Sequence, residues 1–199
     1  GLGHQFRTQT DTECIVHAYE QFGVACFARL RGMFAVAILD TRQGQVILAR
    51  DRLGKKPLFY TRQADGTLAF ASELKCFHEL PGFEPQVSNT ATRDYFSLGY
   101  VPQPASIYEG VYKLPPAHVL VVRGVHQTLS SFWEPCFEPK WTDSESQLED
   151  RLLEHLDDAV RVRLVSDVPF GAFLSGGTDS SVVAALMARH MSQPVKTFS

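Results

Sequence analysis

The chain has 199 residues and a formal net charge of −3, with 44% hydrophobic and 21% charged residues, which excludes disorder for most of it. Its longest run of basic residues is the pair Lys55 and Lys56. The sequence therefore argues against nucleic acid and anionic membranes as partners. There is no apolar run of the ~20 residues that a membrane-spanning helix needs, and no signal peptide is recognisable. We therefore expect a soluble cytoplasmic protein that does not bind membranes.

The cysteines and the chain ends also limit the interpretation. The four cysteines are far apart and show no zinc-ligand spacing, so we predict free thiols. Gly1 is not preceded by an initiator Met, and the apolar residues near Ser199 are typical of a strand that is just beginning. We expect the sequence to be a fragment of a longer protein.

The first part of the chain alternates between helix and strand signals. Cap residues followed by apolar residues at helical spacing predict a helix over 12–22, which Gly23 ends. Short apolar runs separated by turns predict an antiparallel meander of about four strands between residues 33 and 72. Because these runs are apolar nearly throughout, both faces of the sheet should be covered. The remaining predicted elements of this part are a short helix at 92–98 and strands at 119–122 and 131–133.

A second domain is predicted after a linker at 136–140. Thr142 and Glu145 form a capping-box pattern, and the helix that follows should run to about Val165. A short buried strand at 170–174, a glycine loop and a helix at 180–191 come next. In an α/β sheet the ligand site lies beyond the carboxyl end of such a strand.

The loop Ser175-Gly-Gly-Thr-Asp-Ser-Ser181 carries the strongest chemical signal. A helix N-terminus presents free N–H groups to anions, and Gly176 and Gly177 allow close backbone approach to a phosphate. Asp179 would repel a phosphate unless it holds a magnesium ion that bridges to it, and we predict that role. The alternative is that Asp179 and Ser180 only cap the helix. A loop of the G-x-x-x-x-G-K-[ST] type is excluded because it requires a Lys.

The loop and several upstream motifs together resemble glutamine-hydrolysing asparagine synthetases. The loop is similar to the S-G-G-x-D-S pyrophosphatase loop of enzymes that activate a carboxylate as its adenylate. The upstream motifs occur in the family's order and span nearly the whole chain: Asp11-Thr-Glu13, Arg31 to Asp40, Ala49 to Tyr60, Phe70 to Lys75, Gly99 to Pro102 and Lys113 to Pro116.

This resemblance implies an α+β fold followed by an α/β fold. Residues 1–138 would be the C-terminal portion of a glutaminase domain of the N-terminal-nucleophile type, with antiparallel sheets and covering helices. Residues 142–199 would begin an ATP-pyrophosphatase domain with a parallel sheet. Asp11 matches the carboxylate that binds the α-amino group of glutamine, and its alternative role is a plain helix cap.

The resemblance also assigns nucleotide contacts. Phe173, Leu174 and Ser175 fall where the family contacts ATP, and Gly176, Gly177, Asp179 and Ser180 fall where it holds pyrophosphate. Thr178 and Ala117 depart from the family's usual residues, Ala117 from a glycine in a turn. We assign no catalytic residue: the family's nucleophile is a Cys at the very N-terminus, and Gly1 stands here. None of the seven histidines is assigned to catalysis.

The basic segment at 50–56 has two interpretations. Arg50, Arg52, Lys55 and Lys56 could form a substrate patch, but pairing of these arginines with Asp51 in a turn is favoured.

The parent enzyme is expected to convert ATP, aspartate and glutamine into asparagine through a β-aspartyl adenylate, with Mg²⁺ as cofactor. This fragment should be inactive alone, and a homodimer of the parent is left open. One alternative is a related amidotransferase that acts on another carboxylate. The other is a noncatalytic nucleotide-binding module, which a buried Asp179 carboxylate would disfavour because burying it without a cation is costly.

Overall fold

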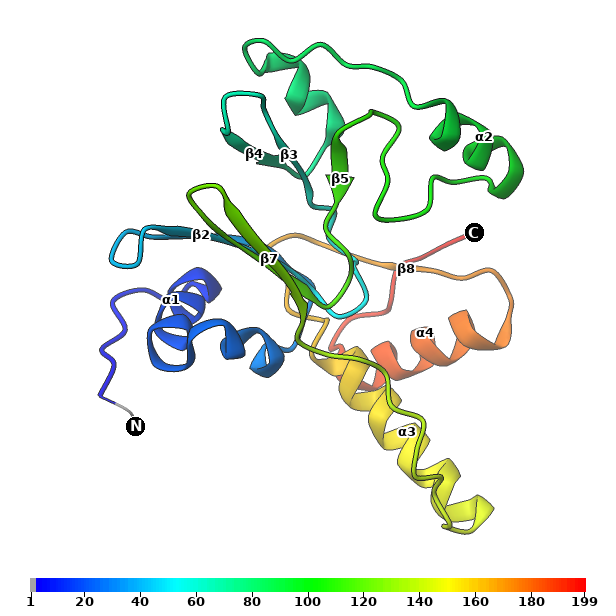
Figure 1. Ribbon diagram of the computed structural model, residues 1–199. Helices are drawn as coiled ribbons and strands as arrows, with labels where there is room; N and C mark the ends of the chain where they lie inside the picture. The colour runs from blue at the N-terminus through cyan, green and yellow to red at the C-terminus, as the bar shows by residue number, and fades with distance from the viewer. Residues whose placement is uncertain (1–2) are drawn as a thin grey trace. The chain divides into compact units, whose positions relative to one another are not determined.

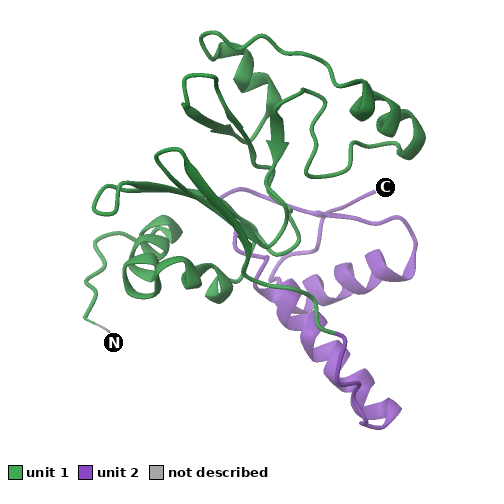
Figure 2. Ribbon diagram, viewed as in Figure 1, with its two compact units in different colours: residues 1–136 green, residues 137–199 purple. Residues whose placement is uncertain are grey.

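The computed structural model describes residues 3–199, and the chain divides into two compact units, 1–136 and 137–199 (Figure 2). Each unit is described by itself. In the described part of the chain, every helix is too short or too polar to cross a lipid bilayer.

Unit 1 contains two α-helices, two 3₁₀ helices and seven strands within its described residues (Figure 1). In chain order these are α1 (Asp11–Phe22), η1 (Gly23–Arg29), β1 (Ala35–Asp40), β2 (Gln45–Arg50), β3 (Phe59–Arg62), β4 (Leu68–Ala71), η2 (Leu74–Glu79), α2 (Asn89–Leu98), β5 (Val111–Lys113), β6 (His118–Arg123) and β7 (His126–Ser131).

The predicted first helix is confirmed, and its ends have clear causes. The Thr10 hydroxyl accepts a hydrogen bond from the Glu13 amide and so caps the first turn. Gly23 ends α1 with a φ of +56°, which a glycine adopts without steric cost. The Tyr19 hydroxyl donates to Asp40 Oδ2 at 2.8 Å and links α1 to the end of β1.

The strands form two antiparallel sheets, with orders β1-β2-β6-β7 and β4-β3-β5. The predicted four-stranded meander is therefore wrong, because β2 and β3 are not neighbours. Each hairpin was located correctly, but β2 pairs with β6, a strand about 70 residues further along the chain. The segment 51–58 carries the chain out of the first sheet and into the second (Figure 1).

Core side chains cover both faces of the central strands but not of the edge strand. On one face, Ile47 and Val119 pack with Cys26 and Phe27 of η1. On the other face, Leu48 and Leu120 pack with Leu58 and Leu114. The expectation of two covered faces, made for the runs between residues 33 and 72, is confirmed for β2, whereas β1 and β4 each leave residues exposed. In the edge strand β7, which lies outside those runs, every residue is exposed.

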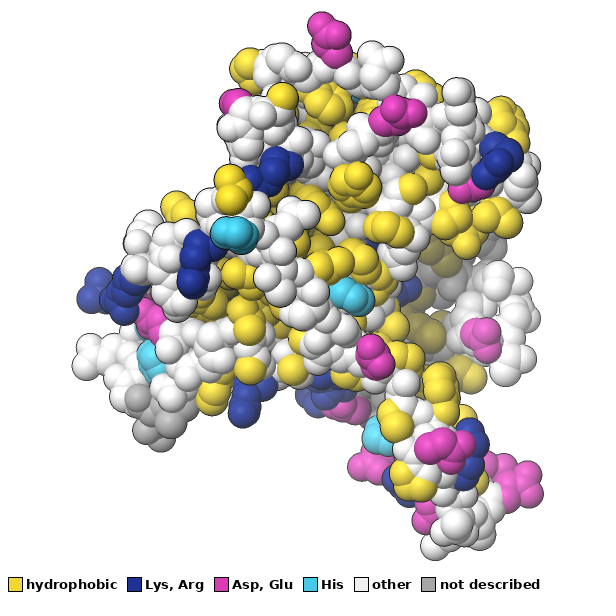
Figure 3. Space-filling view, viewed as in Figure 1, with side chains coloured by type: hydrophobic (Ala, Val, Ile, Leu, Met, Phe, Trp, Pro, Cys, Tyr) yellow, Lys and Arg dark blue, Asp and Glu magenta, His cyan; other side chains and the backbone are white. Residues whose placement is uncertain are grey.

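Several smaller features of unit 1 differ from expectation. The predicted helix at 92–98 begins three residues earlier because Ser88 caps it, and the strand predicted at 131–133 is β7, which ends at Ser131. Ala117 has a φ of +57°, where the family's glycine would be unstrained. Exposed hydrophobic side chains of α2 include Tyr95, Phe96 and Leu98 (Figure 3).

All four cysteines are free, as predicted. Cys26 is buried, and burial raises the pKa of its thiol to about 11.

Unit 2 consists of α3 (Glu145–Arg161), β8 (Ala172–Phe173), α4 (Thr178–His190) and β9 (Thr197–Phe198). β8 and β9 pair in parallel, as an α/β domain requires. The predicted capping box is shifted: Ser144 and Gln147 form it, not Thr142 and Glu145. α3 ends at Arg161, four residues before the predicted Val165, because tighter turns follow it. The predicted strand exists but is not buried, since Phe173 is 86% exposed.

Candidate functional site

Asp11 begins helix α1 without capping it. Thr10 supplies the cap, so the Asp11 carboxylate is left exposed at the first turn, where a negative charge is favourable. Among the described residues its side-chain partner is the Thr12 hydroxyl, which donates to Oδ1 at 3.4 Å. The alternative role of Asp11 as a plain helix cap is therefore wrong, and its carboxylate is available to a ligand.

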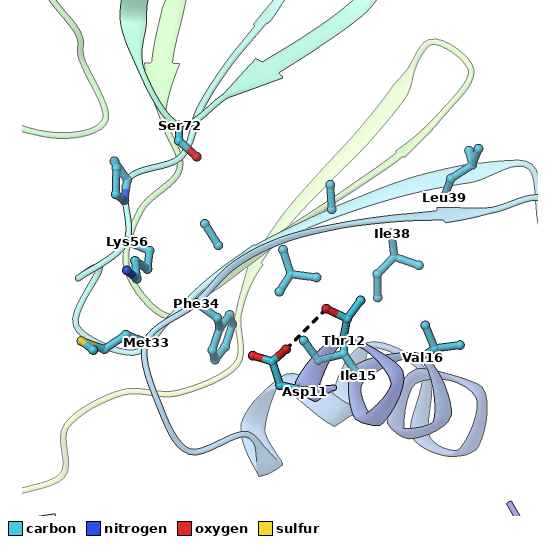
Figure 4. Close-up of a pocket in the computed structure, with 14 residues that line it drawn as sticks. Asp11, Thr12, Ile15, Val16, Met33, Phe34, Ile38, Leu39, Lys56 and Ser72 are labelled. Atoms are coloured by element: carbon cyan, nitrogen blue, oxygen red, sulfur yellow. Dashed lines mark hydrogen bonds between the residues drawn. The ribbon is translucent and has the colours of Figure 1, made fainter. Parts of the chain in front are cut away.

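Asp11 lies at the rim of an open cavity of about 770 Å³ between α1 and β1 (Figure 4). The cavity lining is apolar apart from four residues: Asp11, Thr12, Lys56 and Ser72. Most of the rest is formed by apolar side chains of α1, of β1 and of the residues just before β1, among them Ile15, Phe34 and Ile38. One acidic and one basic side chain in an apolar hollow suit a small zwitterion such as an amino acid.

The loop that carries Lys56 is fixed by a buried carboxylate, Asp51, and a partly buried guanidinium, Arg50, which bind backbone groups rather than each other. Asp51 is 2% exposed and accepts hydrogen bonds from the amides of Phe34, Leu53, Lys55 and Lys56 at 3.0–3.3 Å. Burial alone would raise the pKa of Asp51, but these hydrogen bonds outweigh it and hold the pKa below its usual range.

Arg50 completes this loop from the other side. Its guanidinium donates to the carbonyls of Lys56, Gly54 and Leu114 at 2.7–2.8 Å, and burial lowers its pKa. The segment stabilises a turn as predicted, but the predicted pairing of Arg50 with Asp51 is wrong, because both side chains bind backbone groups instead. Lys56 is the member of the segment that lines the cavity.

The glycine loop of unit 2 has the backbone of an anion-binding helix start. Gly176 has a φ of +80°, and Gly177 is the N-cap of α4 without any side-chain cap. The first backbone bond of the helix runs from the Ser181 amide to the Gly177 carbonyl at 3.1 Å. The amides before Ser181 therefore remain free for a ligand, as at other helix N-termini.

The serine side chains of this loop bind within the loop, whereas the Asp179 side chain does not. Ser180 and Ser181 donate to the Gly177 carbonyl at 3.1 and 2.8 Å, and Ser175 Oγ lies 3.1 Å from Ser180 Oγ. Within residues 3–199 the Asp179 carboxylate makes no hydrogen bond or ion pair, and the N-cap of α4 is Gly177, so the capping alternative is wrong for Asp179. Asp179 is exposed, which also overturns the argument that its burial disfavours a noncatalytic module.

The residues before the loop are held by the parallel strand pair. The Leu174 amide donates to the Phe198 carbonyl at 2.7 Å, and the Ala172 amide donates to the Lys196 carbonyl at 2.9 Å. A Cβ atom on Gly171 would lie 2.4 Å from the Lys196 carbonyl oxygen, so a glycine is required there. Sequence reasoning placed Phe173 and Leu174 at this strand end but missed Gly171, whose place beside a short apolar run was the available signal.

Comparison with known proteins gives the two units separate family models. Residues 1–133 match the family model of the glutamine amidotransferase domain. The chain belongs to that family. Residues 151–199 match the family model of asparagine synthase.

Individual relatives cover nearly all of this chain. The glutamine-hydrolyzing asparagine synthetase 3 of Bacillus subtilis is 37% identical over 202 residues, which covers 99% of this chain and 33% of the relative. Asparagine synthetase 1 of the same organism is 33% identical, covering 99% of this chain and 31% of the relative. Amidase chry2 of Gibberella zeae is 34% identical, and the match covers 96% of this chain and 28% of the relative. The chain thus spans about a third of the length of the curated relatives it matches.

Among solved structures, the glutamine phosphoribosylpyrophosphate amidotransferase of B. subtilis aligns with 98% of this chain and 40% of its own chain. The TM-score is 0.43 and the sequence identity 15%.

Proposed function

We propose that the chain is part of a glutamine-dependent asparagine synthetase, in which unit 1 serves glutamine hydrolysis and unit 2 serves ATP-dependent activation of aspartate. The observation that carries this proposal is the occurrence of a glutamine amidotransferase match and an asparagine synthase match in one chain, in that order. Relatives named as glutamine-hydrolyzing asparagine synthetases match across both units.

In unit 1, the cavity beside α1 is the proposed glutamine site. The exposed Asp11 carboxylate pairs with the α-ammonium group of glutamine, and the positive charge of Lys56 in the same lining favours the α-carboxylate. The apolar walls accommodate the methylene groups.

In unit 2, the loop before α4 is the proposed nucleotide site. Phe173, Leu174 and Ser175 contact ATP, while Gly176, Gly177 and Ser180 bind the pyrophosphate through backbone amides and a hydroxyl. Asp179 is the residue that would hold Mg²⁺, which when bound neutralises charge on the phosphates.

The proposed reaction joins two steps through ammonia. Hydrolysis of the glutamine side-chain amide gives glutamate and ammonia. An oxygen of the aspartate β-carboxylate attacks the α-phosphorus of ATP and pyrophosphate leaves, forming the β-aspartyl adenylate. Ammonia then attacks the acyl carbon, and AMP leaves with formation of asparagine. The helix N-terminus stabilises the charge that develops on the departing pyrophosphate.

The deciding assay uses the protein at its full encoded length, with ATP, Mg²⁺, glutamine and aspartate, and follows AMP and amino-acid products together. Equal amounts of AMP and asparagine are expected. No AMP with aspartate as acceptor would contradict the proposal.

Asp179→Asn tests the second site specifically. Loss of the metal-holding carboxylate should lower Mg²⁺-dependent AMP formation at least a hundredfold and leave glutamine hydrolysis within about twofold of wild type. The matched control is Asp150→Asn on the exposed surface of α3, which should change neither rate. AMP formation at the wild-type rate in Asp179→Asn would make the metal assignment wrong.

A second candidate function is amidation of a carboxylate other than that of aspartate. It is favoured by the relative named amidase chry2, which matches this chain about as well as asparagine synthetase 1 does. AMP formation that requires an acceptor other than aspartate would establish this second function and keep both site assignments.

A further inference from the structure

Two histidines and a glutamate meet beside the start of unit 1, in a cluster that glutamine binding does not use. His17 and Glu20 lie one turn apart on α1, and His4 reaches them from the segment that precedes the helix. The two imidazole rings are 4.7 Å apart between centroids, and Phe6 packs edge-on against His17. Both imidazoles are partly buried, while Glu20 is more exposed.

Three ligand atoms of this cluster form a small triangle. His4 Nδ1 lies 3.1 Å from His17 Nδ1, Glu20 Oε2 lies 3.3 Å from His17 Nδ1, and it lies 3.8 Å from His4 Nδ1. The centre of a triangle with these sides is about 2 Å from each corner, which matches zinc–nitrogen and zinc–oxygen bond lengths. The spacing of the three atoms therefore suits a single bound ion.

The far nitrogens of the two rings differ in their surroundings. His4 Nε2 lies 3.4 Å from Gln21 Oε1, within hydrogen-bond distance. His17 Nε2 is buried without a hydrogen-bond partner, and the nearest carboxylate oxygen, Glu13 Oε1, lies 3.7 Å away. Glu13 is itself fixed, because it accepts hydrogen bonds from the amides of Arg7 and Thr8 at 2.7 and 2.6 Å. An imidazole that binds a metal commonly directs its other N–H group toward such an oxygen, which fixes its tautomer.

The inner nitrogens of the two rings meet at one point. The Nδ1 atoms are 3.1 Å apart, so without a cation one ring donates its Nδ1–H group to the other. Glu20 adds a carboxylate oxygen to the same point. A cation at the centre of the triangle would replace that proton and bind both imidazole lone pairs and the carboxylate.

We propose that His4, His17 and Glu20 bind one divalent transition-metal ion per chain, with zinc as the best match, and that water completes a tetrahedral site. Two imidazoles and a carboxylate suit zinc, cobalt or nickel and not magnesium, which prefers oxygen ligands. The ion would fasten the segment around His4 to α1. This site is independent of the proposed nucleotide site and of asparagine synthetase activity.

The test is a calorimetric titration of ZnCl₂ into the protein, prepared without a histidine tag, stripped of metal with EDTA and with its exposed thiols alkylated. We expect one zinc per chain with a dissociation constant in the micromolar range or below. His17→Gln and Glu20→Gln should each weaken binding at least tenfold, and excess Mg²⁺ should not compete. Glu20→His, which keeps a metal ligand, should retain binding.

The control substitutions remove the same side chains elsewhere in the chain. His126→Gln on β7 and Glu149→Gln on α3 are exposed positions and should leave zinc affinity within about twofold of wild type. Thermal melting of the metal-free variants checks that each one folds, and the surface position of Glu20 makes Glu20→Gln the safest of them.

Cobalt substitution provides the second readout. Cobalt bound by two nitrogens and oxygens gives visible d–d bands without a thiolate charge-transfer band, and this is the expected spectrum. The proposal is overturned by a thiolate band, by zinc binding that survives in both His17→Gln and Glu20→Gln, or by the absence of micromolar binding. In the last case a shared proton must separate the two imidazoles instead.

Discussion

The two units differ in what holds their secondary structure in place. In unit 1 the central strands β2 and β6 are buried between two hydrophobic clusters, and each cluster joins segments far apart in the sequence. Among the described residues of unit 2, only Leu186 and Met187 are buried hydrophobic residues, and both lie on α4. Unit 2 therefore depends on helix ends, turns, one short parallel strand pair and polar contacts between α3 and α4, such as that of His190 Nε2 with Asp157 Oδ1 at 2.9 Å.

This difference teaches how the two candidate sites are positioned. Asp11 and Lys56 reach one cavity because long-range packing brings α1, β1 and the loop after β2 together. The loop at 175–180 is shaped almost entirely by its own neighbours, through Gly176, Gly177 and the first turn of α4. Substitutions should therefore act through the core in unit 1 and through local backbone geometry in unit 2.

The largest effect on stability is expected for Asp51→Asn in unit 1. An asparagine would place an NH₂ group against backbone donors and lose the charge that strengthens four hydrogen bonds. We expect a loss of about 3 kcal/mol. Amide hydrogen exchange of β2 and β6 measures the loss of stability for unit 1 alone. The control is Asp65→Asn, which lies in an exposed turn.

The same carboxylate makes stability depend on acid. The pKa of Asp51 is held below its ordinary value of 3.8 in the folded protein. Its contribution is therefore fully present above that pH and is lost as the pH falls through the lower, folded pKa. The protection of unit 1 amides from hydrogen exchange should therefore decrease as the pH falls from 3.8 to the folded pKa of Asp51 in the wild-type protein. The decrease should be much smaller in Asp51→Asn. An equal fall in both proteins would assign the acid sensitivity to other groups.

Gly171→Ala should have the largest effect in unit 2. The added methyl group would collide with the Lys196 carbonyl and separate β8 from β9. We expect a cost of about 2 kcal/mol, or about a thirtyfold loss of exchange protection at the Ala172 and Leu174 amides. Gly177→Ala is the matched structural control, since its methyl group would have room. Undiminished protection in Gly171→Ala would show that the strand pair tolerates a side chain there.

A smaller effect is expected at the start of α3. Ser144→Ala removes the capping hydroxyl and should destabilise the helix by about 1 kcal/mol. Thr142→Ala, the residue that the sequence pattern favoured, should cost almost nothing. Urea titrations followed by circular dichroism compare the two variants, and a larger loss in Thr142→Ala would restore the original assignment.

The sequence predicted local structure well where one short segment decides it. Helix α1, the two hairpins and the strand–loop–helix order of unit 2 follow from caps, turns and apolar spacing. The pairing of β2 with β6 could not be predicted, because Val46 to Ala49 are equally suited to pair with any nearby apolar strand. Two capping-box patterns overlap before α3, Thr142 with Glu145 and Ser144 with Gln147. Only the residue at which the helix begins distinguishes them.

The candidate site shows the same limit. The exposed Asp11 and the glycine loop were identifiable from motifs, whereas Lys56 and Ser72 enter the cavity lining only through the path of the chain between the two sheets. Burial was the least predictable property, as the exposed Asp179 and Phe173 show. The sequence gives the chemistry of each side chain, but it does not show which other segments of the fold cover that side chain.

The division of roles between Thr10 and Asp11 has a consequence for how the family can diversify. Because Thr10 alone closes the first turn of α1, the residue at position 11 can change its charge or length without unwinding the helix. A relative that differs at this position would therefore keep the helix cap and lose only the favourable interaction of the Asp11 charge with the helix N-terminus. Had one side chain served both purposes, the same change would also have removed the cap.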